Sequence, residues 1–330
     1  MERQLARFRE RSLDESLLHT PKFQMVEAAL DVPGFGIEPQ LLSEIRASVT
    51  HIMHNAWTVN FSLTLPSFEP DLKAVRNLVE LSWSSPYSPP PSIQFTSSIG
   101  IFEHCTLPPP IPEIPLNASS ALGSGYSESK WIAEQILRNV GELTGIPSVV
   151  VRLGQISGDK TGHWNVREWF PALVKSAVFT RCLPNVEGEA SFFLSYPAAR
   201  AFVEMRSSPA PILHLVHPHP VSWHDLITPI AEELGVQLVP YATWLAALER
   251  SAEGSEGDAA RENPALRLLD FFRSFAQGNE KPPLGLWQLA TSKAVDVSET
   301  LANMPQLGEA DVRRWVAGWR KSGFLNASPN

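Results

Sequence analysis

A tyrosine and a lysine stand four positions apart in the segment GSGYSESKWIAEQIL, residues 123–137. Residues at this spacing share one face of a helix, with their Cβ atoms about 6 Å apart. An ammonium beside a phenol favours the phenolate, which eases proton exchange near neutral pH. Tyr126 and Lys130 are therefore candidates for an acid–base pair, with a buried structural tyrosine as the alternative interpretation.

Three hydroxyl side chains, Thr96, Ser97 and Ser98, end a predicted strand ahead of that helix. Sheets of the α/β type present residues to ligands at the carboxyl ends of their strands. A hydroxyl placed there can hydrogen-bond a substrate carbonyl oxygen as it becomes an alkoxide. Each of the three hydroxyls is a candidate for this role.

Strand and helix patterns alternate over the first half of the chain, as in an α/β fold with right-handed crossovers. Apolar and β-branched runs predict strands over 49–56, 93–102 and 148–156. Apolar residues at helical spacing predict helices over 69–81 and 126–143.

From about residue 160 the pattern becomes mostly helical and rich in tryptophan, and 211–218 is the one later segment with a strand pattern. We expect an α/β fold: an incomplete Rossmann-like parallel sheet with a mostly helical C-terminal substrate lobe. The predicted boundaries are 1–160 for the Rossmann-like domain and 161–330 for the lobe, with 190–220 returning to the sheet.

Composition restricts the class of function. The 330 residues are 43% hydrophobic and 19% charged, as in globular proteins. The formal charge of -8 argues against nucleic-acid binding, which needs clustered lysine and arginine.

The two cysteines and the apolar runs bear on the compartment. Cys105 and Cys182 have no metal-ligand spacing and fit a reducing compartment. No apolar run approaches the roughly 20 residues that span a bilayer. We expect a cytoplasmic protein with no nucleic-acid partner, no membrane partner and no metal.

Several motifs, taken in order, resemble those of one family: the thioester reductase domains of fungal carboxylic-acid-reductase-like and nonribosomal-peptide-synthetase-like enzymes. That family lies in the extended short-chain dehydrogenase/reductase superfamily. The likeness covers almost the whole chain, and linked motifs are far more specific than any one of them. The matching segments are THIMHNAWTVNF (50–61), FTSSIG (95–100), GYSESKW (125–131), VVRLGQISG (150–158), GHWNVREWFP (162–171) and TSKAVDVSETLANMP (291–305).

The resemblance implies a role for each matching position. Tyr126 matches the general acid that protonates the substrate oxygen while NADPH delivers hydride. Lys130 matches the residue that holds the nicotinamide ribose and lowers the tyrosine pKa. Ser98 is the choice for the carbonyl-orienting hydroxyl, with Ser97 second. The other positions expected to line the cofactor are Asn55, Ala56 and Trp57 after their strand, and Arg152, Gly154, Gln155 and Ile156 on the nicotinamide side.

The implied reaction is NADPH-dependent reduction of a carrier-bound or activated acyl thioester to an aldehyde or alcohol, in secondary metabolism. Trp164 and Trp169 are candidates for the floor of the substrate channel, with packing inside the lobe as the alternative. Two other functions stay open: an impaired remnant that binds an acyl group or a carrier protein, and a different extended short-chain dehydrogenase for alcohols or sugars. The histidines at 214, 217, 219 and 224 are interpreted as packing residues.

The family's glycine-rich turn, whose backbone N–H groups hold the cofactor pyrophosphate, has no match in this sequence. GFG at 34–36 lacks the strand before it and the helix after it that such a turn needs. We therefore expect an N-terminally truncated domain, in which the cofactor half is damaged more than the catalytic half and NADPH binding is affected. Loss of the central first strand would leave its neighbour with an unpaired edge.

Overall fold

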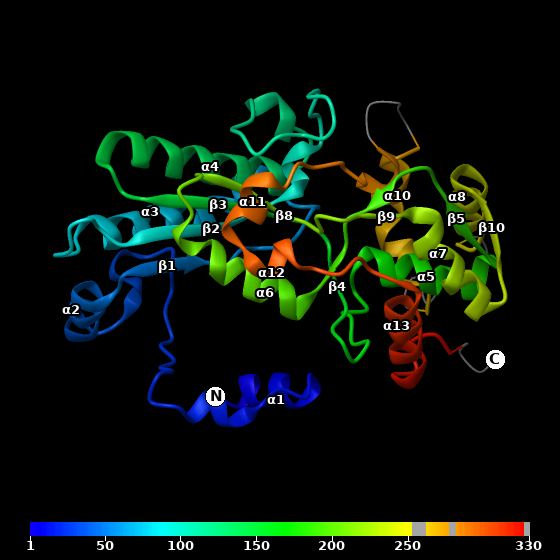
Figure 1. Cartoon of the computed structure of the whole chain (residues 1–330), viewed down its shortest axis with the longest axis horizontal. Helices are drawn as coiled ribbons and strands as arrows, with labels where there is room; N and C mark the ends of the chain where they lie inside the picture. Colours follow the sequence, from blue (N-terminus) through cyan, green and yellow to red (C-terminus); the bar gives the residue numbers. More distant parts are fainter. Residues whose placement is uncertain (253–261, 277–281, 327–330) are drawn as a thin grey trace.

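The computed structural model describes residues 1–252, 262–276 and 282–326. A parallel sheet with its helices forms one half of the molecule, and a mostly helical lobe forms the other (Figure 1). The expected α/β class is confirmed. Within these ranges, no helix combines the length and apolar character that crossing a membrane requires.

The sheet half alternates strands with helices. Its strands are β1 (His51–His54), β2 (Ser92–Ser98), β3 (Ser148–Leu153) and β8 (Ile212–Leu215), which pair in parallel in the order β1-β2-β3-β8. Its helices are α2 (Pro39–Ser48), α3 (Glu69–Trp83), α4 (Gly125–Thr144), α6 (Ser195–Glu204), α11 (Ser292–Val297) and α12 (Glu299–Ala302), whereas α1 (Glu2–Glu10) lies apart from the sheet in Figure 1. The predicted helices over 69–81 and 126–143 are confirmed.

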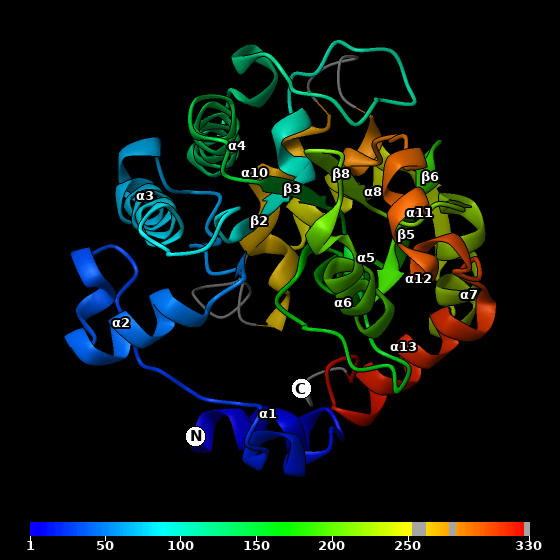
Figure 2. The ribbon, with the colours of Figure 1, turned by 60° about the vertical axis from the view of Figure 1, so that its left-hand side comes forward.

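Each face of the sheet has its own apolar core because successive side chains along a strand point to opposite sides. Ile52, Phe95 and Val150 pack toward α3 and α4 on one face. Val151 and Leu213 pack toward α6, α11 and α12 on the other. Figure 2 shows these helices on the two sides of the sheet. Covering both faces is what a parallel sheet requires.

The strand predicted over 93–102 ends four residues early. Ile99–Phe102 forms a 3-10 turn. Ser98 causes the change, because its Oγ accepts a hydrogen bond from the Gly100 N–H at 3.0 Å and caps the turn. The early end places Ser98 at the carboxyl end of β2.

β1 lies at one edge of the sheet. In the part of the chain that the structure describes, β2 is its one strand neighbour, and Met53 of β1 is 38% exposed. The preceding residues form α1, α2 and two 3-10 turns. One of these turns contains the GFG segment, in which Gly34, Phe35 and Gly36 adopt left-handed backbone conformations.

The lobe contains more strands than its sequence pattern predicts. The expectation of a single strand after residue 160 is wrong, because short segments pair with partners far away in sequence; for example, Gln237–Pro240 pairs in parallel with Cys182–Asn185. The elements are β4 (Ile156–Ser157), α5 (Trp169–Thr180), β5 (Cys182–Asn185), β6 (Glu189–Ala190), β7 (Phe193–Leu194), β9 (Val221–Ser222), α7 (Trp223–Leu234), β10 (Gln237–Pro240), α8 (Tyr241–Arg250), α10 (Leu269–Ser274) and α13 (Glu309–Lys321).

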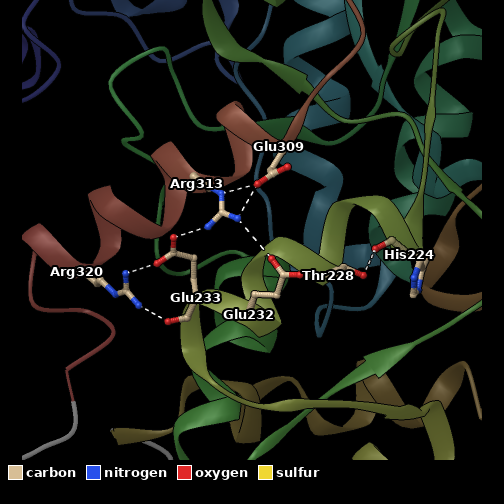
Figure 3. A network of polar contacts seen from close by, with 7 residues as sticks. All are labelled: His224, Thr228, Glu232, Glu233, Glu309, Arg313 and Arg320. Carbon is tan, nitrogen blue, oxygen red and sulfur yellow. Dashed lines mark hydrogen bonds and ion pairs between the residues drawn. The ribbon is translucent and has the colours of Figure 1, made fainter.

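Helix α13 is joined to α7 by both ion pairs and apolar packing. Arg313 contacts Glu309 of its own helix and Glu233 of α7, each at 2.6 Å, and Arg320 pairs with the same Glu233 (Figure 3). Exposed ion pairs contribute little to stability. The fully buried Trp315 and Trp319 of α13 belong to the same apolar core as the buried residues of α7, and this burial contributes more than the exposed ion pairs.

Candidate functional site

Helix α4 brings the tyrosine and the lysine to the carboxyl end of β2. Ser124 caps the helix, since its Oγ accepts a hydrogen bond from the Ser127 N–H at 3.2 Å. Gly125 is required by close approach, because a Cβ there would overlap the backbone of residues 63–65. The loop between β1 and α3 therefore lies directly against the first turn of α4.

Ser98 and Tyr126 are brought together by the fold. The Ser98 hydroxyl lies near enough to the Tyr126 side chain, which is 7% exposed, to affect its pKa. Burial raises the pKa of the Tyr126 phenol, and the neighbouring Ser98 hydroxyl lowers it by a smaller amount. The net upward shift differs from the lowering that the resemblance implies. Two neighbouring hydroxyls can hydrogen-bond one carbonyl oxygen.

Lys130 lies beside them, enclosed by protein groups. Its Nζ donates a hydrogen bond to the Thr96 carbonyl oxygen at 2.7 Å and lies 5.9 Å from the centroid of the Tyr126 ring. The side chain is 3% exposed. Burial lowers the pKa of Lys130 to about 7, against the opposing charges of Asp71 and Glu134.

Of the three predicted cofactor residues that follow β1, Trp57 contacts this lysine. Asn55 and Ala56 are exposed, whereas Trp57 is half-buried, with its ring centroid 4.2 Å from the Lys130 Nζ. The Trp57 Nε1–H donates to the Ser129 Oγ at 3.3 Å. Trp57 thus contacts the lysine to which the cofactor role was assigned.

Ser97 and Arg152 are directed into the protein interior instead of toward a ligand. The Ser97 hydroxyl donates to Glu134 Oε1 at 2.5 Å, and the Arg152 Nη2 pairs with Glu134 Oε2 at 2.8 Å. Arg152 is fully buried, and its Nη1 also donates to the Ile114 carbonyl oxygen. In this structure both side chains make contacts inside the fold, and the substrate contact of Ser97 and the cofactor contact of Arg152 stay predictions.

The remaining predicted residues after β3 form a connection to the lobe. Gly154 allows the chain to pass Val216, whose Cγ1 would lie 2.6 Å from an added Cβ. Gln155 donates to Glu168 through Nε2 and accepts from the Trp169 Nε1–H through Oε1, both at 2.7 Å. Ile156 is half-buried and pairs with Phe193.

The two tryptophans proposed for the channel floor differ in position. Trp164 packs in the lobe core against Phe170 and Trp315, with ring centroids 5.0 and 4.9 Å away. Its Nε1–H donates to Glu168 at 2.9 Å. These contacts agree with the alternative interpretation of Trp164 as a packing residue. Trp169 is half-buried at the rim of the same core.

The histidines of the 211–224 region also have structural partners. His214 is hydrogen-bonded to the Ala290 carbonyl oxygen at 2.8 Å, and His217 to the Pro305 carbonyl oxygen at 3.0 Å. No group of three or more histidine, cysteine, aspartate or glutamate residues is arranged to hold a metal within residues 1–252, 262–276 and 282–326.

Two site residues were not predicted from the sequence: Glu134 and Asp71. Glu134 had a usable signal, because it follows Lys130 by four residues on the same helix face. Asp71 had none, since only the folded loop brings it close. His54, which alternates with His51 along its strand, is predicted to orient the backbone or the cofactor. Burial lowers the pKa of His54 to about 4, and its Nε2 has no hydrogen-bond partner.

The surroundings of the Lys130 ammonium, next to His54 and Trp57, have the hydrogen-bonding groups that a polar ligand needs. The His54 Nε2 is buried without a partner, and His54 lies next to the Lys130 ammonium. Unsatisfied buried polar atoms are costly, so a hydroxyl-bearing group would find partners here. The residues present therefore fit the ribose end of a nicotinamide cofactor.

A parallel α/β sheet that presents Ser98, Tyr126 and Lys130 at its carboxyl edge defines a Rossmann-like reductase of the short-chain dehydrogenase type. The chain belongs to the male sterility protein family, whose NAD-binding model matches residues 1–197. A nucleotide cofactor of the NAD(P) type follows from this membership.

Curated relatives agree with that assignment. The adenylate-forming reductase Nps10 of Heterobasidion annosum is 42% identical over 339 residues, which cover 99% of this chain and 31% of that protein. The carboxylic acid reductase of Neurospora crassa is 29% identical, over 90% of this chain and 30% of its own length. The chain thus spans about a third of the length of these relatives.

Solved structures share the fold. The terminal R domain from the myxalamid PKS-NRPS pathway superposes with a TM-score of 0.76 at 23% identity, covering 96% of this chain and 79% of that one. The reductase domain of a nonribosomal peptide synthetase from Mycobacterium tuberculosis gives a TM-score of 0.71 at 17% identity, covering 94% and 78%. The resemblance to reductase domains is confirmed.

Proposed function

We propose that this chain is a reductase domain that converts an acyl thioester to an aldehyde, with NADPH as the hydride donor. The observation that supports the proposal best is that the Ser98 hydroxyl lies near enough to Tyr126 to lower its pKa, while the Lys130 Nζ lies 5.9 Å from the centroid of the tyrosine ring. The printed names of the relatives, an adenylate-forming reductase and a carboxylic acid reductase, support the same class of reaction.

The proposed chemistry needs two roles from the hydroxyls. The Ser98 and Tyr126 hydroxyls hydrogen-bond the thioester carbonyl oxygen and orient its carbon. Bound NADPH supplies the hydride to that carbon. Tyr126 gives its proton to the oxygen, and Lys130 stabilises the phenolate that remains. The hemithioacetal then collapses: its C–S bond breaks, its hydroxyl proton passes to sulfur, and aldehyde and thiol leave.

The proposed substrate is an acyl group on a pantetheine thiol, either free or attached to a carrier protein, in secondary metabolism. A thiolation–reductase di-domain is among the solved structures with this fold, which supports a carrier-bound substrate. A further reduction of the aldehyde to the alcohol would use the same groups. The proposed location is the cytoplasm.

The test is a reductase assay with an acyl-pantetheine thioester and, separately, an aldehyde, following NADPH absorbance. Tyr126→Phe removes the proton donor, so we expect the rate to fall by roughly 10²-fold or more. Tyr196→Phe is the matched control, because that tyrosine is exposed on α6. Retention of the rate by Tyr126→Phe, or absence of NADPH oxidation by the wild type, contradicts the proposal.

A second candidate function is binding of an acyl ligand without turnover. The burial of both Tyr126 and Lys130 favours it, because neither side chain is open to solvent. Titration with an acyl-pantetheine separates the two: binding without NADPH oxidation supports the binding module. Oxidation of NADPH by a sugar or simple ketone, and not by thioesters, would instead indicate another extended short-chain dehydrogenase.

A further inference from the structure

The Lys130 ammonium is closed in by the protein on the side from which a ligand would reach it. Within the part of the chain that the structure describes, its one hydrogen-bond acceptor is the Thr96 carbonyl oxygen. The Nζ lies 4.2 Å from the centroid of the Trp57 ring and 4.7 Å from that of Phe95. An ammonium has three donors, so the two others face aromatic rings.

Phe95 and Trp57 both shield the Lys130 ammonium, but they differ in how firmly the protein holds them. Phe95 belongs to β2 and is fully buried in the core between the sheet and α3 and α4. Trp57 belongs to the loop after β1 and is half-buried. Its indole is held by one long hydrogen bond to Ser129 and by ring contacts with Phe95 and His54, at 5.3 and 5.9 Å. Trp57 is therefore the cover that can move.

The same loop also covers the tyrosine. The Phe61 ring meets the Tyr126 ring edge-on at 4.8 Å, although Phe61 itself is 62% exposed. Val59, between the two aromatic residues, is exposed as well. The loop is fastened at Thr58, whose N–H donates to Asp71 at 2.9 Å. With its tip largely in solvent, the loop gives up little buried apolar surface when it is displaced.

We propose that Trp57 is a positioning and access residue: its indole occupies the ligand side of the Lys130 ammonium and must move away before a ribose hydroxyl can bind there. The proposal rests on the proposed function for the identity of that ribose. The cover itself is a property of this chain's own residues. When Trp57 moves, the unsatisfied His54 Nε2, whose ring lies 5.9 Å from the Trp57 ring, becomes available to the ligand.

The experiment measures how fast Lys130 reacts with an acylating reagent in the folded full-length chain. Short pulses of N-acetoxysuccinimide are followed by peptide mass spectrometry, with the exposed Lys73 as internal reference. Trp57→Ala should label Lys130 roughly tenfold faster than the wild type does, because loss of a desolvated cation–π contact opens the ammonium. Trp83→Ala, at an exposed tryptophan of α3, should leave the rate unchanged.

Trp57→Phe keeps an aromatic ring at the position and guards against a general loosening of the fold. Protection of Lys130 in Trp57→Phe together with fast labelling in Trp57→Ala supports the proposal. Wild-type Lys130 that reacts as fast as Lys73, or Trp57→Ala that reacts no faster than the wild type, overturns it. Circular dichroism checks that each variant is folded.

Addition of NADPH separates this proposal from the proposed function. If both hold, NADPH slows the labelling of Lys130 in Trp57→Ala, because the ribose takes the place of the indole. If Trp57→Ala exposes Lys130 and NADPH has no effect, the cover stands and the NADPH-dependent function fails. If NADPH protects Lys130 in the wild type and Trp57→Ala loses that protection, Trp57 is a platform for the cofactor, and the proposal is overturned.

Discussion

At the scale of single residues, Lys130 has the most demanding electrostatic position near the candidate site. Its ammonium is buried, with one carbonyl acceptor and two aromatic rings as neighbours. Burial favours the neutral amine, whereas the carboxylates of Asp71 and Glu134 favour the ammonium. Because burial outweighs the two carboxylates, the pKa of Lys130 falls from its ordinary value of 10.5 to about 7.

The lowered pKa of Lys130 makes folding stability depend on pH. Between about pH 7 and the ordinary lysine value, the unfolded chain binds a proton that the folded chain has released, so the wild type gains stability as pH rises. Below about pH 7 both states are protonated, and the full cost of burying the charge is present. We expect the unfolding free energy of the wild type to rise relative to Lys130→Met between about pH 7 and 10.

Urea unfolding of both proteins, followed by circular dichroism at several pH values, measures this difference. Comparison with Lys130→Met cancels the other titrating groups, which the two proteins share. Lys160→Met, at an exposed lysine, is the control and should track the wild type at every pH. A difference between Lys130→Met and the wild type that is constant with pH would show that the lysine stays charged in the folded state.

At the scale of elements, α4 connects the candidate site to the centre of the sheet. Tyr126, Lys130 and Glu134 lie four residues apart and share one helix face. Glu134 accepts hydrogen bonds from Ser97 of β2 and from Arg152 of β3. The helix is thus fixed to two neighbouring strands one turn after Lys130.

Glu134→Gln leaves the Arg152 guanidinium buried without its counter-charge. We expect it to lower the unfolding free energy by roughly 3–5 kcal/mol, since breaking one side of a buried ion pair has this cost. The matched control is Glu142→Gln on the same helix, where an exposed carboxylate lies 3.9 Å from Arg138. Urea unfolding measures both, and equal effects of the two substitutions would refute the importance of the buried pair.

Gly125→Ala tests the contact between α4 and the loop that precedes α3. The new Cβ would overlap the backbone of residues 63–65, which a side-chain rotation cannot relieve. We expect a loss of about 1–3 kcal/mol in unfolding free energy. Gly141→Ala, in the same helix with room for a Cβ, should instead gain roughly 0.5–1 kcal/mol. A neutral Gly125→Ala would mean that the loop is displaced at no cost.

At the scale of the whole molecule, the order of the elements around the sheet could be predicted and their long-range partners could not. The helix over 126–143 has a strong apolar stripe, and the structure extends it by one residue at each end. β10 has four residues and pairs with β5, a contact that no local pattern reveals. Its pairing is a consequence of the lobe core, which sequence periodicity does not describe.

In the candidate site, too, some features could be predicted from the sequence and others depend on contacts made only in the fold. The fold brings Ser98, Tyr126 and Lys130 together as the motifs predict, although their roles remain proposals. Sequence alone gives Ser97 and Ser98 the same chemistry. The strand decides between them, because successive side chains point to opposite faces, and it directs Ser97 to Glu134. Resemblance assigned Arg152 to the cofactor, and the structure adds a buried ion pair with Glu134 that no sequence pattern indicated.

Because most tryptophans lie in the lobe, tryptophan fluorescence reports mainly on unfolding of the lobe, whereas far-ultraviolet circular dichroism reports on the helices and strands of the whole molecule. Six of the ten tryptophans, Trp164, Trp169, Trp223, Trp244, Trp315 and Trp319, belong to or line the lobe core, whereas Trp57, Trp83 and Trp131 lie around the sheet and Trp287 packs with Trp131 against a separate cluster. Intrinsic emission during denaturation is therefore dominated by the lobe. Coincidence of the emission transition with the far-ultraviolet transition would show that lobe and sheet melt as one cooperative unit, and separate midpoints would show two.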